Sequence, residues 1–555
     1  MLGPVALGEQ WPGGGNAARG LSKKLDEPPF LRTICFLYGK PGAAVIGYEF
    51  IAAQLALRMP PVQRPAQLRP VTRIEPMADL LAVPRQVAPA DDATLLDHLL
   101  FALKHEDLNL ALLLEGLRLV SAEELSAALA AQRTGSYLRK AAFLWEKAHG
   151  SELPLPWDST GGNYVDLFDA DAYYVGPVWE RSQRLRVNFN GIGPFEFCPM
   201  VRRDEALAGR GQNVLDSLRA WAADAGNQGT LDRVLNWAYL AETRESFAIE
   251  NETPSPDKER AFLQALATLR ERRPLTEGYL VDLQNTVISS PLMAEAEFRN
   301  RQNWLQRGGR GALAVRYLPP PPDALPALMD GWMRMANSTE GDVPPLVRAA
   351  LVSFGFVFLH PFMDGNGRLS RLLAHHSLNL QQALPRADGQ ATLLPLSVAM
   401  KRHEADYLAA LEAFSRPARH LWDVTCLADN EFLFDFRSTP HIYAHWNGEA
   451  AARFVTTCAE QALAQSLIEE TLFIQAFDQA FDRIDRSFNL PNRTINLLIQ
   501  WIRQNGGQLP ARRRNAPELV GLQPAQIDHI AAMVAACFKA HEPAQPPTDQ
   551  QADEA

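Results

Sequence analysis

The chain is poor in cysteine. Its 555 residues include five, which lie far apart at Cys35, Cys198, Cys426, Cys458 and Cys537. None of them forms a CxxC pair, which excludes the usual ligand spacing of zinc sites and the thioredoxin-like redox motif. Scattered single cysteines fit a reducing compartment, where disulfides are rare. We therefore expect each cysteine to be a small residue of the hydrophobic core.

The sequence also lacks long hydrophobic runs and an excess of positive charge. No stretch of about 18 apolar residues occurs, so no helix is expected to span a membrane. The N-terminus contains Glu9 and has no basic stretch before an apolar run, which makes it a poor signal peptide. The net charge of −10 argues against a protein that coats nucleic acid, because such proteins present a basic face. We expect a cytoplasmic protein without a membrane partner.

Helical periodicity dominates between the two ends of the chain. Apolar residues recur at spacings of three and four, as in amphipathic helices. The length favours two to four domains, because a single core rarely extends beyond about 250–300 residues. We expect a mainly α-helical, multi-domain protein with a mostly helical N-terminal domain over 29–225, a central domain over 226–415 and a helical C-terminal domain over 416–540. The Gly- and Pro-rich segment 1–28 and the polar tail 541–555 are expected to be disordered.

Two regions depart from this helical pattern. Short runs at 172–176, 185–189 and 195–201 are predicted to be strands. In the C-terminal domain, a Gly506-Gly507 turn and the basic run Arg512 to Arg514 separate two helices, as in a winged-helix-like module. A helical docking domain with a solvated basic loop is favoured over that module, because no aromatic residues are interleaved with the arginines.

The central domain has the clearest element boundaries. The sequence predicts helices over 325–336, 345–359, 366–382 and 397–415. The prolines from Pro319 to Pro322 end an extended segment before the first of these helices, because proline can neither continue a helix nor donate to a sheet.

The segment that follows the helix 345–359 carries the chemistry. It reads HPFMDGNGRLSR, from His360 to Arg371. Glycines on both sides of Asn366 leave backbone N–H groups unobstructed at the start of a helix, which is an anion-binding arrangement. Arg368 and Arg371 are three residues apart, so both guanidinium groups lie beside that site and suit a polyphosphate.

Two further side chains complete this arrangement. The Asp364 carboxylate could hold a Mg²⁺ ion that bridges phosphate oxygens, and His360 could take a proton near neutral pH. Singly, each feature has an ordinary explanation, such as a packed histidine, a DGNG turn or solvated arginines. Together they predict phosphoryl or nucleotidyl transfer, because two cations placed against the positive end of a helix dipole favour a bound anion.

The segment 360–371 resembles the signature of the Fic family, HPFx[D/E]GNGRxxR, at every fixed position. The resemblance implies a protein adenylyltransferase that transfers AMP from ATP, with Mg²⁺, to a Ser, Thr or Tyr hydroxyl of a target protein. It implies that His360 is the base and Asp364 the metal ligand. It also implies that the nucleotide phosphates are bound by Gly365, Asn366, Gly367, Arg368 and Arg371, while Pro361 and Phe362 are structural.

The resemblance extends over about 230–415 and implies an all-helical Fic core with a small β-hairpin flap. The flap segment, 298–332, would pair with an extended stretch of the target. Tyr407 stands where an aromatic often lies near the nucleotide base, and a buried helical tyrosine is an equal alternative for it. The family resemblance is also compatible with self-modification and with a homo-oligomer.

A further part of the resemblance concerns regulation. The residues from Ser246 to Asn251 match the family's inhibitory motif, [S/T]xxxE[G/N], and place the inhibitory helix near 240–251. Glu250 would then pair with Arg371 and occupy the guanidinium group that the γ-phosphate needs. The alternative is a solvent-facing Glu250 at a helix end, with Asn251 as its C-cap.

Two other functions stay open at this point. The same site could use another nucleotide or phosphate donor, or it could belong to an ATP-sensing regulatory binding protein. The presence of His360 argues against the sensor, because a sensor has no use for a base.

Overall fold

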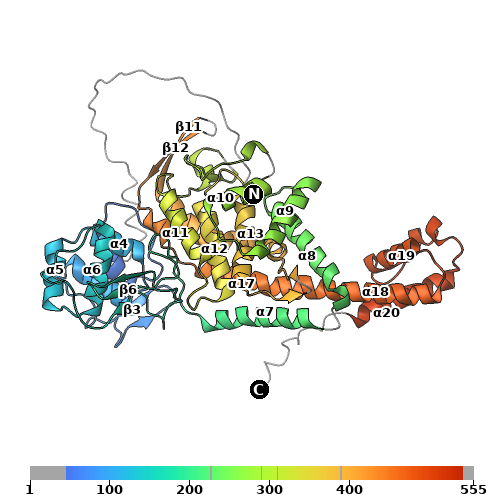
Figure 1. The fold of residues 1–555 in the computed structure, drawn as a ribbon, viewed down its shortest axis with the longest axis horizontal. Coiled ribbons are helices and arrows are strands. Elements are labelled where there is room, and N and C mark those ends of the chain that lie inside the picture. The colour runs from blue at the N-terminus through green and yellow to red at the C-terminus, as the bar shows by residue number, and fades with distance from the viewer. Residues whose placement is uncertain are drawn as a thin grey trace.

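The computed structural model describes residues 45–224, 228–288, 291–308, 310–387, 390–428 and 431–541. The described residues do not include the segment 1–28, Cys35 or residues 542–555, so the predictions for these parts lie outside them. Helices dominate, and the described strands form small sheets, which confirms the mainly α-helical fold. The molecule is elongated, with the N-terminal part at one end and a group of C-terminal helices at the other (Figure 1). None of the described helices is long and apolar enough to cross a membrane.

The N-terminal part packs helices against two small sheets. The helices are α2 (Gly47–Gln54), α3 (Leu95–His105), α4 (Leu110–Leu117), α5 (Ala122–Ala131) and α6 (Ser136–His149). One sheet contains β1 (Ala66–Leu68), β2 (Glu75–Pro76) and β3 (Leu81–Val83). The other contains β4 (Val165–Asp166), β5 (Glu180–Ser182) and β6 (Val187–Phe189). Hydroxyl side chains begin two of these helices, since Thr94 and Ser121 accept the N–H groups of Asp97 and Glu124.

The strand predictions in this part are only partly right. The strand predicted at 185–189 is β6. The strands predicted at 172–176 and 195–201 are wrong, since these segments form only isolated bridges at Tyr173 and Met200. The physical reason is that backbone amides of the second segment bond to a distant loop: Cys198 donates to the carbonyl of Ala444, and Met200 to that of Trp446.

The central part is a bundle of helices around α12 (Figure 1). The helices predicted at 325–336, 345–359 and 366–382 are α11 (Leu325–Asn337), α12 (Pro345–Leu359) and α13 (Asn366–Leu380). The helix predicted at 397–415 is divided at His403 into α14 (Leu396–Arg402) and α15 (Glu404–Arg419). The surrounding helices are α7 (Glu205–Ala223), α8 (Gln228–Ile249), α9 (Pro256–Thr268), α10 (Glu277–Val287), α16 (His441–Ala444) and α17 (Glu449–Ala462).

The buried apolar residues form three main clusters. One lies in the N-terminal part and ends at Met200, a second surrounds α12 and α13 and extends to Ile474, and a third runs from Ala480 to Cys537. The predicted domain limits at 225 and 415 both fall within the range of the second cluster. Those limits stay a prediction: the second cluster also includes Ala111, Tyr174, Ile192 and Phe197 of the N-terminal part, and the third begins only at Ala480.

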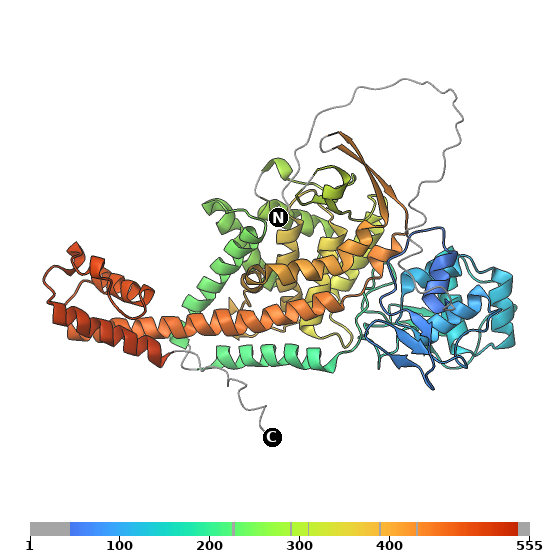
Figure 2. The same cartoon turned by 180° about the vertical axis from the view of Figure 1, so that it is seen from behind.

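The described residues of this part include one short antiparallel pair, β9 (Arg386–Ala387) with β10 (Gln390–Ala391), and two β-hairpins that lie beside the bundle. The first hairpin pairs β7 (Leu305–Gln306) with β8 (Val315–Tyr317) in antiparallel register, which confirms a hairpin within the predicted flap segment. The second, formed by β11 (Trp422–Ala428) and β12 (Glu431–Phe436), was not predicted and is seen above the bundle in Figure 2. It packs on the flap, because the Trp304 ring contacts Phe432 and Phe434.

The C-terminal helices are α18 (Glu469–Ser487), α19 (Asn492–Gln504) and α20 (Pro524–Ala540). No strand occurs in the described residues 437–541, so the structure there has helices without a wing. In the basic run, Arg513 stacks on Trp501 and Arg514 lies 2.6 Å from the Asp528 carboxylate. Cys198, Cys458 and Cys537 are buried as predicted. The prediction of a core position is wrong for Cys426, which is exposed on the projecting hairpin strand β11.

Candidate active site

The loop between α12 and α13 has an unusual backbone at both ends. α12 ends at His360, which adopts the left-handed conformation with φ 50° and ψ 57°. α13 begins after Gly365, whose φ of 84° favours glycine. A left-handed residue other than glycine is held only where its surroundings fix it. The loop is therefore strained at the predicted base and needs support from neighbouring side chains.

Arg299 and Asn303, at the start of the flap segment, supply this support. The Arg299 guanidinium is buried and donates to the carbonyl of His360 at 2.8 Å and to that of Pro320 at 2.7 Å. The Asn303 amide donates to the carbonyl of Phe362 at 2.9 Å. Sequence reasoning missed both residues, because they lie about 60 positions before the loop. The only signal was the polar run FRNRQN that opens the flap segment.

Asn366 and Phe362 close the loop from within. The Asn366 side chain accepts the N–H of Phe362 at 3.0 Å and donates to its carbonyl at 2.7 Å. The Phe362 ring is fully buried and packs on Phe298 and Phe356. Phe362 therefore anchors the loop in the core, as predicted. The Asn366 side chain therefore bonds within the loop. The backbone N–H of Asn366 is then the group of this residue for the predicted phosphate contact.

His360 is buried and has a defined orientation. Its Nδ1 lies 3.0 Å from the carbonyl oxygen of Val357. A neutral imidazole that donates from Nδ1 has its lone pair on Nε2, so Nε2 is the nitrogen that can take a proton. Burial lowers the pKa of His360 to about 4, and its imidazole is therefore neutral at pH 7. The side chain is thus in the form that a general base requires.

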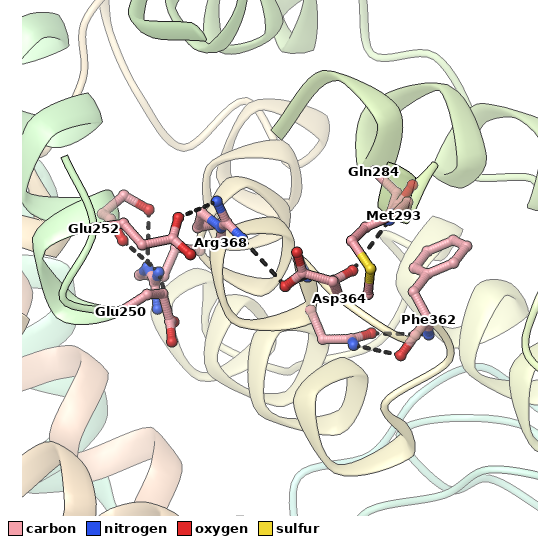
Figure 3. A network of polar contacts seen from close by, with 11 residues as sticks. Glu250, Glu252, Gln284, Met293, Phe362, Asp364 and Arg368 are labelled. Carbon is pink, nitrogen blue, oxygen red and sulfur yellow. Dashed lines mark hydrogen bonds and ion pairs between the residues drawn. The ribbon is translucent and has the colours of Figure 1, made fainter. Parts of the chain in front are cut away.

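The two arginines of the motif are buried and paired with carboxylates. Arg371 lies 3.0 Å from Glu250, and it also donates to the hydroxyl and carbonyl oxygens of Ser246 at 2.9 and 2.6 Å. Arg368 lies 2.7 Å from Glu252 and 3.3 Å from Asp364. Figure 3 shows Glu250 and Glu252 side by side at the end of α8, with Arg368 reaching between Glu252 and Asp364. The contact predicted between Glu250 and Arg371 is present.

Glu250 also lies against the backbone of α13. A Cβ atom added to Gly367 would collide with Oε1 of Glu250 and would lie 3.4 Å from Nη1 of Arg371. The carboxylate therefore rests at the N-terminal turn of α13, where the helix dipole and free N–H groups attract anions. A negatively charged oxygen already occupies the predicted phosphate site in this conformation.

Asp364 is the candidate metal ligand. Its side chain is about one-fifth exposed, and Oδ1 accepts the N–H of Gly365 at 2.6 Å. Among the described residues, no group of three or more His, Cys, Asp or Glu side chains is arranged to hold a metal. A single carboxylate still fits Mg²⁺, which is usually bound by one or two carboxylates together with substrate phosphates and water.

Tyr407 lies behind the site. Its ring packs on Phe454 and Phe354, with centroids 5.5 and 6.1 Å away. Burial raises the pKa of the Tyr407 hydroxyl, and the nearby Arg371 charge opposes this rise. This position fits the alternative of a buried helical tyrosine, and a contact with the base stays a prediction.

Comparison with known proteins identifies the central segment. Residues 274–378, which include α10, the flap, α12 and most of α13, match the Fic/DOC family. The chain contains a Fic domain. Curated relatives named protein adenylyltransferase Fic are 29% identical over 197 residues in Drosophila melanogaster (30% of this chain, 38% of the relative) and 30% identical over 178 residues in Drosophila ananassae (32% and 33%). The similarity thus spans less than two-fifths of either relative.

Solved structures of Fic proteins align with parts of this chain at low TM-scores. A Fic family protein from Desulfovibrio desulfuricans aligns with a TM-score of 0.36 and 16% identity, over 51% of this chain and 80% of that chain. Fic-1 from C. elegans aligns with a TM-score of 0.29 and 18% identity, over 47% of this chain and 71% of that chain.

Proposed function

We propose that this protein is a protein adenylyltransferase that moves AMP from ATP to a Ser, Thr or Tyr hydroxyl of a target protein. The observation that carries the proposal is the grouping of a neutral histidine, a glycine-lined helix N-terminus and two buried guanidinium groups on one loop and the helix that follows it. Each part suits one element of nucleotidyl transfer. The arginines and the helix end suit the phosphates, and the histidine suits the incoming hydroxyl.

At the α-phosphorus, the proposed reaction forms one P–O bond and breaks one, and a proton is transferred to the base. The target hydroxyl oxygen attacks the α-phosphorus of ATP in line, and the bond to the pyrophosphate oxygen breaks. The hydroxyl proton passes to Nε2 of His360, while Arg368 and Arg371 neutralise the leaving pyrophosphate. Mg²⁺ held by Asp364 would supply further positive charge to the phosphates. No covalent enzyme intermediate is needed, so alignment and charge neutralisation carry the rate enhancement.

The flap is the proposed site for the target backbone. β7 and β8 form a two-stranded sheet, and an extended segment of a target can add to such a sheet by main-chain hydrogen bonds. The flap is joined to the catalytic loop, because Arg299 at its start bonds to His360. A segment bound there would therefore be held at a fixed distance from the base.

The resting state is proposed to be autoinhibited by Glu250. Arg371 is almost fully buried and needs an anionic partner, and Glu250 supplies it where ATP would place a phosphate. Asn251 follows in the left-handed conformation with φ 60°, which ends α8 so that Glu250 faces α13. Glu250 and Asn251, the last two residues of the inhibitory motif, thus each have a physical role in this inhibition.

The test is incubation of the Glu250→Gly variant with Mg²⁺ and ATP labelled at the α- or the γ-phosphorus. Protein label from the α position alone, on a target in lysate or on the enzyme itself, supports adenylyl transfer. Label from the γ position means phosphoryl transfer. No label from either position, with ATP binding intact, favours another donor or an ATP-sensing role. The Glu250→Gly/His360→Ala double variant is the control for transfer that does not depend on the base.

A further inference from the structure

The end of α8 directs two carboxylates, not one, into the phosphate site. The N–H of Glu252 donates to the carbonyl of Phe247 at 3.1 Å, and the N–H of Asn251 donates to that of Ala248 at 3.0 Å. These two bonds, with Asn251 in the left-handed conformation, form a Schellman motif. The motif reverses the chain directly after Glu250, so that Glu252 faces the same helix as Glu250 does.

Each carboxylate contacts a different arginine of the Fic motif. Glu250 lies 3.0 Å from Arg371, and Glu252 lies 2.7 Å from Arg368. Arg368 is further fixed by the Phe247 ring, which lies 5.1 Å from its guanidinium carbon. The end of α8 therefore contacts the Arg368 guanidinium with one carboxylate (Figure 3) and also with the Phe247 ring.

We propose that Glu252 is a second inhibitory carboxylate, which holds Arg368 as Glu250 holds Arg371. The inference rests on the proposed function and extends its regulation to the other arginine. In the resting site, the negative charges of Asp364, Glu250 and Glu252 face two guanidinium groups. A triphosphate must therefore displace both glutamates, and release of Glu250 alone leaves Arg368 occupied.

The burial of Arg368 distinguishes this pair from an ordinary surface ion pair. A salt bridge between exposed side chains contributes little to binding or stability. The Arg368 side chain is 2% exposed and that of Glu252 is 28% exposed, so the cation is buried and the anion reaches it from the rim. A buried cation requires a partner, and a ligand phosphate competes directly with the partner that is present.

The test compares four full-length proteins: the wild type, Glu250→Gly, Glu252→Gln, and the double variant. The dissociation constants of ATP and of AMP are measured for each by calorimetry with Mg²⁺. The double variant should bind ATP about tenfold more tightly than Glu250→Gly, the effect of one charge-assisted hydrogen bond. Affinity for AMP should be the same in both, because AMP lacks the β- and γ-phosphates that Arg368 would contact.

The matched control is Glu259→Gln, which removes a carboxylate paired with the exposed Arg244 on the outer side of α8. Thermal melting checks that each variant is folded, and Glu252→Ala repeats the test with a different side chain. If neither substitution at Glu252 changes the ATP affinity of the Glu250→Gly protein, this inference is overturned and the proposed function is left intact. Absence of ATP binding in every variant rejects both.

Discussion

The Glu242 carboxylate lies 2.9 Å from Nε2 of His375, deep between α8 and α13. Both side chains are 1% exposed, and the same carboxylate accepts the N–H of Ser397 at 2.8 Å and its hydroxyl at 2.5 Å. Glu242, Ser246 and Glu250 are four residues apart along α8, so they share one face. That face contacts Arg371 and His375, which are also four apart on α13. The proposed inhibitory glutamate is thus held by two further turns of the same helix.

Loss of the Glu242 carboxylate should loosen α8. Glu242→Ala leaves three donors without their acceptor, so the free energy of unfolding should fall by about 3 kcal/mol. AMP transfer should rise, because Glu250 loses the anchor that keeps it on Arg371. Chemical denaturation and the labelled-ATP assay measure the two effects. Glu245→Ala, three residues further along α8, is the control, and lower stability without faster transfer would show that Glu242 only supports the fold.

Much of the site was predictable because its residues are local. The Fic signature places His360, Asp364, Arg368 and Arg371 on one loop and the following helix, and helical spacing fixes their faces. The contact of Glu250 with Arg371 spans 121 positions and was predicted only through the family resemblance. The role of Glu252 was not predicted, because it depends on the left-handed turn at Asn251.

Other features were missed, some of them because tertiary contacts decide the structure. The buried role of Arg299 depends on carbonyl groups of a distant loop. The second hairpin did have a local signal, since Phe432, Phe434 and Phe436 alternate with exposed residues along β12. The strands predicted near 172 and 195 are wrong although these segments had a local signal. Their composition suits strands, but their amides bond to other loops.

The pH dependence of transfer should report the buried state of His360. Burial lowers its pKa to about 4, and a base acts only when it is unprotonated. In the Glu250→Gly protein, kcat/KM should therefore stay constant as the pH falls through about 6.5, the usual histidine pKa, and should drop only near the lower value. The acid limb of the pH profile of kcat should lie at higher pH than that of kcat/KM, because bound phosphates stabilise the imidazolium.

The control for this profile is the Glu250→Gly/His360→Ala protein. It should lose transfer by a factor of about 10²–10⁴ and keep its ATP affinity. An acid limb of kcat/KM at pH 6.5 would contradict a buried base in the free enzyme. Retained transfer in the alanine variant would remove His360 from this role.

Asp364→Ala should remove the response of the enzyme to Mg²⁺. Asp364 is the candidate ligand at the loop, so transfer should fall to a low rate that no longer varies with Mg²⁺ concentration. The measurement is a Mg²⁺ titration of transfer in the Glu250→Gly background. Asp330→Ala, an exposed acidic position on α11, is the matched control. A normal Mg²⁺ response in the Asp364 variant would place the metal on other groups.

Gly367→Ala should block the phosphate site even without the inhibitory glutamate. A Cβ at this position enters the space that Oε1 of Glu250 fills in the resting conformation. When ATP displaces Glu250, a phosphate oxygen would take the same space. In the Glu250→Gly background, the glutamate is absent, so any loss of ATP affinity must come from the methyl group at the N-terminal turn of α13. Binding of ATP should fall by at least about tenfold, the effect of one lost charge-assisted hydrogen bond.

The matched substitution is Gly278→Ala, in the first turn of α10, where an added Cβ meets no atom within 4 Å. It changes the same residue type in the same domain, and it should leave ATP affinity and transfer unchanged. Equal affinity in the two alanine variants would mean that the phosphates do not approach the backbone at Gly367. The nucleotide would then lie elsewhere on the loop, and the overlap between Glu250 and a bound phosphate would no longer explain inhibition.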